Sequence, residues 1–242
     1  MAPNEQYNPR LGVLGGMGPL ATAVFYNRLV ERSSDYATSD QDHIDTLILS
    51  DCQIPDRTEV MLNGDTKELL DRCAADFKIL EFGGCEAICF PCNTLHHFID
   101  QLEELTSLPI ISMVESTMKH LKRNYPDVHT IQVFGTDGTR ISGMYETAAA
   151  AHGLEVVPVK DAVQEEIMGF IYELKNTGRE DFPLLSRRIM QAHRAGVDKV
   201  LLACTELSCM KLTPGAEPYA YDALDALVAE CVEQFLPALQ ND

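Results

Sequence analysis

Two cysteines in this chain occupy similar positions after apolar segments. The stretch 90–97, FPCNTLHH, follows the apolar run 85–89 and places Cys92 before two polar residues. Cys204 likewise follows an apolar run and precedes Thr205. A cysteine in such a place is a metal ligand, an acid/base or nucleophilic group, or a structural side chain that only packs.

A metal site would use the histidines that follow the first cysteine. The four-residue spacing would place Cys92 and His96 on one face of a helix, but zinc needs at least one more protein ligand. The sequence has no second C-x-x-C or H-x-x-x-H cluster apart from the pair formed by Cys89 and Cys92, and Cys89 lies within the apolar run. The pattern favours a helix-surface or capping role for His96 and His97, and we predict no metal site.

Two landmarks recur in the same order in the two halves of the chain. Gly84 and Gly196 each lie eight residues before one of these cysteines, with an apolar run between. The segment 13–19, VLGGMGP, matches 133–139, VFGTDGT, with glycine on glycine at two positions. The two offsets, 112 and 120 residues, are close enough to indicate a duplicated α/β unit.

This symmetry favours an acid/base role for both thiols. Each follows a buried strand at the point where a helix begins, which is where open α/β sheets bind ligands and where a helix N-terminus stabilises a thiolate. If the two units face each other, one thiol can remove a proton from a carbon stereocentre while the other delivers a proton to the opposite face. The pair Cys92 and Cys204 therefore predicts a two-base proton exchange at carbon. We expect structural roles for the other cysteines: Cys52, Cys73, Cys85, Cys89, Cys209 and Cys231.

The glycine-rich segment 16–21, GMGPLA, fits the G-x-G-x-x-A pattern of a dinucleotide-binding turn. Pro19 is unusual in that pattern, and the next predicted strand ends at Asp51, farther on than the roughly 20 residues expected for a ribose-binding acid. We favour a tight turn that aims helix N–H groups at an anion, or a turn without a ligand. An NAD-linked oxidoreductase stays open as an alternative, as does a non-catalytic sensor of small anions.

The hydrophobic pattern predicts the elements that position these residues. We expect strands at 11–14, 46–49, 87–90 and 109–111, and helices from 19 and over 69–82, 97–105 and 221–235. Buried strands separated by amphipathic helices indicate parallel sheets covered on both faces. We predict an α/β fold of two pseudo-symmetric domains, each a mostly parallel sheet flanked by helices. After a loose leader at 1–10, the domains comprise 11–115 with about 218–242, and about 116–217.

The composition describes a globular and strongly acidic chain. Its 242 residues are 45% hydrophobic, enough for an ordinary core. The net charge of -18 makes nucleic acid and anionic membranes unfavourable partners, although a few basic groups at a cleft can still bind a small anion, because surface charges are screened beyond about 8 Å. No signal segment or membrane-length apolar run is present, so we expect a cytoplasmic protein with reduced thiols.

Six short motifs resemble the aspartate/glutamate racemases that work without pyridoxal phosphate. They are GGMGPLAT (15–22), DHI (42–44), IPDRTE (54–59), PCNT (91–94), GT-x-x-T (135–139) and ACTEL (203–207). The resemblance extends from about residue 11 to beyond 221, nearly the whole chain. It implies two pseudo-symmetric α/β domains with the active site between them, a homodimer and no cofactor.

The resemblance also implies a role for each matching residue. Cys92 and Cys204 would be the two acid/base groups, and Arg57 would clamp a substrate carboxylate in the bidentate way that a guanidinium favours. Lys175 would bind the side-chain or α-carboxylate of a dicarboxylic amino acid, aspartate or glutamate. The implied donors around the α-carboxylate, together with one further substrate contact, are Asn93, Thr94, Thr136, Thr205 and Met17.

The chain departs from the family pattern at three places. Leu95 follows CNT where alanine is frequent, which would narrow the cleft or alter only packing, and Asp45 follows DHI where proline is frequent. The motif CTEL at 204–207 differs from the CTHYP of bacterial cell-wall glutamate racemases and disfavours that branch. The paired cysteines disfavour the single-cysteine decarboxylases of the superfamily, but maleate isomerases also keep two cysteines and stay open as an alternative.

Overall fold

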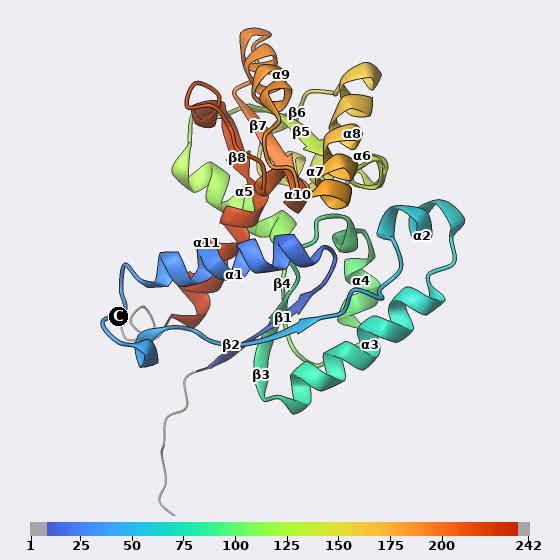
Figure 1. Cartoon of the computed structure of the whole chain (residues 1–242), viewed down its shortest axis with the longest axis vertical. Helices are drawn as coiled ribbons and strands as arrows, with labels where there is room; N and C mark the ends of the chain where they lie inside the picture. The colour runs from blue at the N-terminus through green and yellow to red at the C-terminus, as the bar shows by residue number, and fades with distance from the viewer. Residues whose placement is uncertain (1–8, 237–242) are drawn as a thin grey trace, which may run out of the picture.

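The computed structural model describes residues 9–236 and contains two four-stranded parallel sheets, one in each half of the chain (Figure 1). The first sheet has the order β2-β1-β3-β4 and the second has the order β6-β5-β7-β8, so the same topology is built twice. The strands are β1 (Arg10–Gly15), β2 (Asp45–Ser50), β3 (Cys85–Cys89), β4 (Ile110–Ile111), β5 (Thr130–Gly135), β6 (Glu155–Val156), β7 (Lys199–Ala203) and β8 (Ala220–Asp222). The α/β class and the two parallel sheets predicted from the sequence are confirmed.

Helices connect successive strands and flank both sheets (Figure 1). In the first half they are α1 (Pro19–Ser33), α2 (Arg57–Asn63), α3 (Lys67–Phe82), α4 (Ile99–Glu103) and α5 (Met113–Asn124). In the second half they are α6 (Asp137–Ser142), α7 (Met144–Ala151), α8 (Asp161–Thr177), α9 (Pro183–Arg194), α10 (Thr205–Ser208) and α11 (Ala223–Phe235). Short 3-10 helices lie at Asp40–Asp42, Thr94–Phe98 and Glu217–Tyr219.

The internal repeat read from the sequence is present in the backbone. Strands β1 and β5 begin and end at positions 120 residues apart. Gly84 and Gly196, the glycines that precede β3 and β7, both have positive φ, 76° and 97°. Because glycine adopts this left-handed conformation without steric cost, the two glycines allow equivalent turns before the equivalent strands β3 and β7.

Three predicted boundaries are wrong in detail. Arg10 does not belong to a leader, because it begins β1 and its guanidinium binds Asp45 and the carbonyl of Gly83; residues 1–8 lie outside the described part. Tyr221 lies in the short strand β8, so the last helix begins at Ala223. After Asn93 the chain first forms a 3-10 turn, and α4 is shorter than predicted.

The last helix, α11, lies between the two halves and packs on α1 and α5 (Figure 1). The largest cluster of buried side chains contains Val13 and Phe25 from the first half, Ile131 and Leu201 from the second, and Leu227 of α11. A shared apolar core of this kind resists separation of the halves, because pulling them apart would expose it to water. The domain limits given above stay a prediction.

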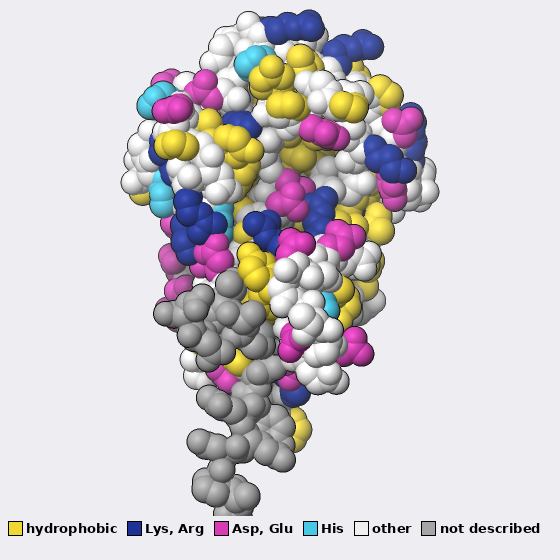
Figure 2. Space-filling view, turned by 90° about the vertical axis from the view of Figure 1, so that its left-hand side faces the viewer, with side chains coloured by type: hydrophobic (Ala, Val, Ile, Leu, Met, Phe, Trp, Pro, Cys, Tyr) yellow, Lys and Arg dark blue, Asp and Glu magenta, His cyan; other side chains and the backbone are white. Residues whose placement is uncertain are grey.

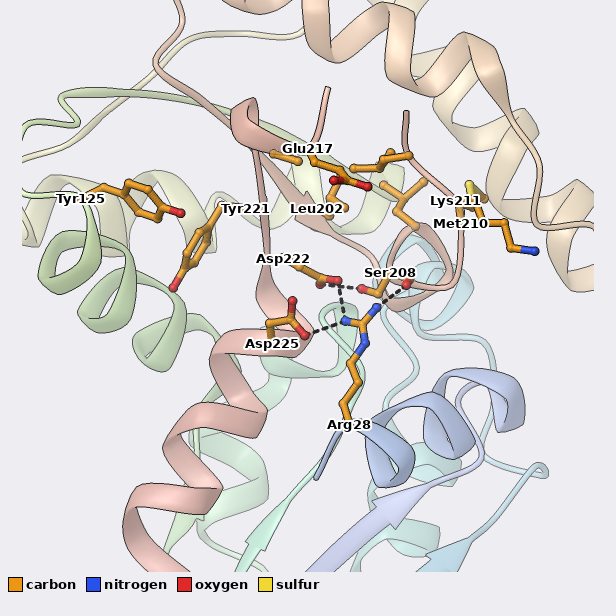
Figure 3. Close-up of a pocket in the computed structure, with 13 residues that line it drawn as sticks. Arg28, Tyr125, Leu202, Ser208, Met210, Lys211, Glu217, Tyr221, Asp222 and Asp225 are labelled. Atoms are coloured by element: carbon orange, nitrogen blue, oxygen red, sulfur yellow. Dashed lines mark hydrogen bonds and ion pairs between the residues drawn. The ribbon is translucent and has the colours of Figure 1, made fainter. Parts of the chain in front are cut away.

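Arg28 of α1 provides a polar link at the same junction (Figure 3). Its guanidinium donates hydrogen bonds to Asp222 Oδ2 at 2.6 Å, to Asp225 Oδ1 at 2.9 Å and to the carbonyl oxygen of Ser208 at 2.6 Å. Figure 3 shows this side chain reaching from α1 to the segments that carry α10, β8 and the start of α11. The link therefore joins the first half to three elements of the second.

The surface mixes charges of both signs. On the face shown in Figure 2, Lys and Arg side chains lie among Asp and Glu side chains, and hydrophobic side chains lie between them. Within residues 9–236, no helix is long and apolar enough to cross a membrane.

Candidate active site

A narrow cavity between the two halves is lined by every residue that the sequence singled out for catalysis or substrate binding. These nine residues are Met17, Arg57, Cys92, Asn93, Thr94, Thr136, Lys175, Cys204 and Thr205. Three further lining residues, Asp56, Thr58 and Glu206, were not predicted. We call this space the cysteine cavity. It gathers residues from the ends of β1, β3, β5 and β7, which is where parallel α/β sheets place their ligands.

The two cysteines reach the cavity by equivalent routes. Cys92 follows β3 and precedes the 3-10 helix that starts at Thr94, and Cys204 follows β7 and is the N-cap residue of α10. Each is 5% exposed. None of the eight cysteines forms a disulfide, and most of the other six are buried, in agreement with the structural roles predicted for them.

Arg57 supplies the positive charge on the Cys92 side. It is the first residue of α2, whose N-cap Asp56 accepts hydrogen bonds from the backbone N–H groups of Thr58 and Glu59. Its guanidinium donates to the carbonyl of Met17 at 3.2 Å, but its Nε is buried without a partner. Burial alone would lower the pKa of Arg57, but the negative charges of Cys92, Asp56 and Glu206 outweigh it and raise that pKa. Arg57 is thus a cation beside Cys92, and its Nε leaves one donor for a ligand.

Glu206 places a negative charge on the Cys204 side. The Cys204 thiol donates a hydrogen bond to Glu206 Oε2 over 2.9 Å, and the Glu206 residue is only 5% exposed. Burial, followed by the charge and hydrogen bond of Glu206, raises the pKa of Cys204 well above its ordinary value. The structure therefore favours the protonated thiol at Cys204.

Lys175 extends from α8 toward the same carboxylate. Its Nζ lies 3.7 Å from Glu206 Oε1, and its side chain is 30% exposed. Burial lowers the pKa of Lys175, but the charges of Glu206 and Cys204 raise it by more, so the net pKa lies above the ordinary value. The lysine is thus a cation at the edge of the cavity.

Asn93 presents a free amide donor. Its Oδ1 accepts a hydrogen bond from the hydroxyl of Tyr145, a fully buried residue of α7, whereas its Nδ2 is buried without a partner. A buried N–H without an acceptor costs free energy, so a ligand oxygen at this point would be stabilised. Because Tyr145 comes from the second half, this contact also joins the halves beside the cavity.

A cluster of threonine hydroxyls closes the cavity from the second half. Thr136 Oγ1 lies 2.9 Å from Thr94 Oγ1 and 3.1 Å from Thr139 Oγ1, and it accepts a hydrogen bond from the Thr139 backbone N–H at the start of α6. Gly138 permits this close approach: a Cβ there would lie 2.8 Å from both Thr58 Oγ1 and Thr94 Cγ2.

The cysteine cavity is small. Its volume of about 20 Å³ suits one water molecule. A neighbouring cavity of about 400 Å³, here called the turn cavity, is lined by residues 16–21, Leu174 and Gly178. The two cavities share four wall residues: Met17, Arg57, Lys175 and Glu206. An amino acid is larger than the cysteine cavity, so its binding would require these walls to move.

His96 has a structural role. It is 3% exposed, its Nε2 accepts a hydrogen bond from the backbone N–H of Met113, and its Nδ1 donates to the carbonyl of Cys92. Burial lowers the pKa of His96 to about 4, so the ring is neutral. The expectation of a surface or capping histidine is wrong for His96 but correct for His97, which is exposed. His96 fixes the backbone that carries Cys92.

Within the described residues, one group has metal-ligand spacing, and it lies away from the cavity. His120, Glu230 and Glu233 hold ligand atoms close together, but Lys119 and Arg123 already pair with these carboxylates. The charges are therefore satisfied by the protein itself.

Two other features of the sequence are explained by packing. Leu95 is fully buried in the core and does not line the cysteine cavity, so its size affects packing only.

At the glycine-rich turn, a Cβ on Gly16 would lie 2.4 Å from the backbone of Asp51, and one on Gly18 would lie 3.3 Å from Glu206 Oε1. A carboxylate so close to Gly18 disfavours an anion, including a pyrophosphate, at this turn.

The three unpredicted wall residues had weak signals in the sequence. Asp56 and Thr58 flank Arg57 within IPDRTE, and Glu206 lies within CTEL. The motifs contained them, but only the folded chain brings Glu206 next to Lys175 from another helix.

The fold and the cavity together define a two-lobed α/β protein with paired thiols and cationic side chains between the lobes. The family model described as Asp/Glu/Hydantoin racemase matches residues 14–231. Over 205 residues the chain is 26% identical to the broad specificity amino-acid racemase RacX of Bacillus subtilis (strain 168), a match that covers 83% of this chain and 86% of that one.

Solved structures agree with this assignment. The chain is similar to Picrophilus torridus aspartate racemase, with a TM-score of 0.79 and 26% identity over 93% of this chain and 94% of that one. The fold also matches an aspartate racemase homologue from Pyrococcus horikoshii, with a TM-score of 0.74 and 22% identity over 93% and 98% of the two chains. The chain belongs to the Asp/Glu/hydantoin racemase family and is an enzyme of the racemase class, a group of isomerases.

Proposed function

We propose that this enzyme racemises an acidic amino acid, aspartate or glutamate, without pyridoxal phosphate, by a two-base mechanism that uses Cys92 and Cys204. The observation that carries the proposal is the single cavity in which both thiols meet two cationic side chains, Arg57 and Lys175. The names of the relatives, an aspartate racemase and a broad specificity amino-acid racemase, support an amino-acid substrate.

The two thiols would act in opposite protonation states. In this mechanism Cys92, which lies beside the cationic Arg57, acts as the thiolate and takes the Cα proton from one face of the substrate, and the C–H electron pair stays on carbon. The Cys204 thiol then delivers its proton to the opposite face, which inverts the stereocentre. Cys92 ends as a thiol and Cys204 as a thiolate.

The remaining wall residues would hold the substrate and stabilise the carbanion-like state. Arg57 and Lys175 offer charge for two carboxylates, and each charge-assisted contact contributes roughly 1.5–3 kcal/mol. The unpartnered Nδ2 of Asn93 is a donor for the α-carboxylate, beside the hydroxyls of Thr94 and Thr136. Donors already in place are most effective where negative charge develops in the transition state. Met17 and Thr205 complete the proposed contacts.

The test is incubation of the purified protein with L-aspartate, and separately with L-glutamate, in heavy water. Loss of the Cα proton by NMR, with appearance of the D-enantiomer by chiral chromatography, is expected for the true substrate. No exchange with either substrate, by folded protein with reduced thiols, would contradict the proposal. Turnover of maleate would then identify the isomerase alternative, and thermal stabilisation by NAD would revive the oxidoreductase. A cytoplasmic homodimer stays a prediction from the sequence.

A further inference from the structure

Every net inversion leaves the two cysteines in exchanged protonation states. If Cys92 starts as thiolate and Cys204 as thiol, the product leaves with Cys92 as thiol and Cys204 as thiolate. Before a second molecule of the same enantiomer can react, Cys204 must gain a proton and Cys92 must lose one. This need follows from the proposed function, on which the inference rests.

Glu206 is the group in contact with the sulfur that must be reprotonated. Its Oε2 lies 2.9 Å from Cys204 Sγ, and Oε1 faces Lys175 Nζ at 3.7 Å and the Gly18 backbone. A buried carboxylate is costly unless it is paired, and here its partners are a weakly donating thiol and a lysine beyond hydrogen-bond distance. A purely structural role therefore does not explain why a carboxylate is buried beside Cys204.

The cavities place the Glu206 carboxylate next to both the Cys204 sulfur and a larger space. Of these two cavities, Cys204 lines only the cysteine cavity, whereas Glu206 lines both the cysteine cavity and the turn cavity. The turn cavity has exposed wall residues, Pro19, Leu20 and Gly178 among them. The carboxylate therefore lies between the buried sulfur and a space that solvent can reach.

We propose that Glu206 is a proton carrier for Cys204, which passes protons between the Cys204 sulfur and solvent in the turn cavity and so resets the cysteine pair between turnovers. In the reset, an acid in solvent protonates the Glu206 carboxylate. The new O–H bond then breaks as the proton moves to the Cys204 thiolate, which regenerates the carboxylate. Cys92 gives its proton to water that enters as the product leaves. One proton enters and one departs, so atoms and charge balance.

Steady-state kinetics separate this role from others. The reset contributes to kcat for net conversion but not to kcat/KM, which reports the steps from the free starting form through inversion. Glu206→Gln keeps the shape of the side chain but cannot carry the proton. We expect kcat to fall by roughly tenfold or more, KM to fall with it, and kcat/KM to change by less than about threefold.

Two further variants and one control complete the test. Glu206→Asp retains a carboxylate and should recover part of the lost kcat, and in Glu206→Ala added formate should raise kcat. Neither recovery is expected of a group that only supports the fold. Glu86→Gln changes an exposed glutamate that lines neither cavity and should leave both constants unchanged. Thermal melting of each variant checks that it folds.

Each outcome decides between the proposals. A Glu206→Gln enzyme with unchanged kcat overturns the carrier role, and so does a parallel fall of kcat and kcat/KM without recovery by aspartate or formate. Absence of racemisation by the wild-type enzyme overturns the proposed function and the carrier role with it.

Discussion

At the scale of single residues, the two thiols have equivalent backbone positions but opposite electrostatic surroundings. Arg57 lies beside Cys92, and Glu206 lies beside Cys204. A cation stabilises a thiolate and an anion stabilises the protonated thiol. The internal repeat therefore supplies two similar groups, and their neighbours make them different.

Substitution of either cysteine tests the two-base assignment. Because a serine hydroxyl is a far weaker acid than a thiol, Cys92→Ser and Cys204→Ser should each lower kcat/KM for racemisation by roughly 100-fold or more. Chiral chromatography of the product gives the rates. The exposed Cys52→Ser is the matched control and should retain full activity. Retention of most activity by either cavity variant would contradict the assignment.

The shape of the Arg57 side chain should matter as much as its charge. Its guanidinium reaches the carbonyl of Met17 while Nε stays available, and a lysine cannot reproduce this fork. We expect Arg57→Lys to lower kcat/KM by roughly tenfold or more. Arg188→Lys changes an arginine of α9 that pairs with Glu166 of α8, and it should have no effect. An unaltered kcat/KM in the first variant would remove Arg57 from the proposed carboxylate clamp.

At the scale of elements, helix α3 carries a buried carboxylate without a partner on one oxygen, and helix α6 carries a glycine with no room for a Cβ. Asp76 of α3 is 8% exposed and its Oδ2 has no partner. Gly138 of α6 faces Thr58 and Thr94 of the first half at close distance. The first feature affects stability and the second affects the fit between the halves.

Asp76 makes stability depend on pH. Burial, and then the charge of Asp51, raise the pKa of this carboxyl from 3.8 to about 6 in the fold. The folded chain therefore holds a destabilised carboxylate above about pH 6, and this penalty disappears as the pH falls toward the unfolded value near 4. We expect Asp76→Asn to raise the free energy of unfolding by up to about 3 kcal/mol at about pH 8 and by almost nothing near pH 4.

Urea unfolding at both pH values measures this difference. Asp71→Asn, at an exposed position on the same helix, is the control and should show no such pH dependence. Equal effects of Asp76→Asn at both pH values would disagree with a raised pKa.

Gly138→Ala should separate the halves locally. A Cβ 2.8 Å from Thr58 Oγ1 and Thr94 Cγ2 forces α6 or its neighbours to move. Since these threonines adjoin the cavity, we expect kcat/KM to fall by roughly tenfold, in line with the sensitivity of catalysis to small displacements. Gly169→Ala on α8, where a Cβ meets nothing within 4 Å, should leave the activity unchanged. Full activity in Gly138→Ala would show that α6 and its neighbours accommodate the added methyl group without disturbing the cavity.

At the scale of the whole molecule, the two halves share a core and a set of polar links across the junction. Arg28 is the most connected of the links described, and its side chain is 25% exposed while that of Asp222 is 12% exposed. Removing the cation would leave the carboxylates of Asp222 and Asp225 close together without the side chain that pairs with both.

We therefore expect Arg28→Met to lower the free energy of unfolding by about 1–3 kcal/mol, because breaking a partly buried pair leaves a poorly compensated charge. Urea unfolding followed by circular dichroism gives the value. The exposed Arg187→Met should change it by less than about 0.5 kcal/mol. A loss that small in Arg28→Met would mean that the apolar core alone holds the halves together.

The sequence by itself determined the fold class, the repeat and nine of the twelve residues that line the cysteine cavity. The hydrophobic periodicity, the glycines and the ends of the predicted strands are local signals in the sequence. Because a parallel sheet brings the carboxyl ends of its strands to one edge, these signals were enough to locate Cys92 and Cys204. The short strand at Tyr221 and the burial of His96 were missed, because a two- or three-residue strand and a buried polar ring depend on neighbours distant in sequence.

The tertiary structure alone decided how the residues of the cavity differ from one another. Glu206 and Lys175 are far apart in the chain, and their contact sets the surroundings of Cys204. Leu95 was equally compatible with a narrowed cleft or with core packing until the fold buried it. Charge, burial and the direction of a side chain depend on three-dimensional neighbours, which a motif does not contain.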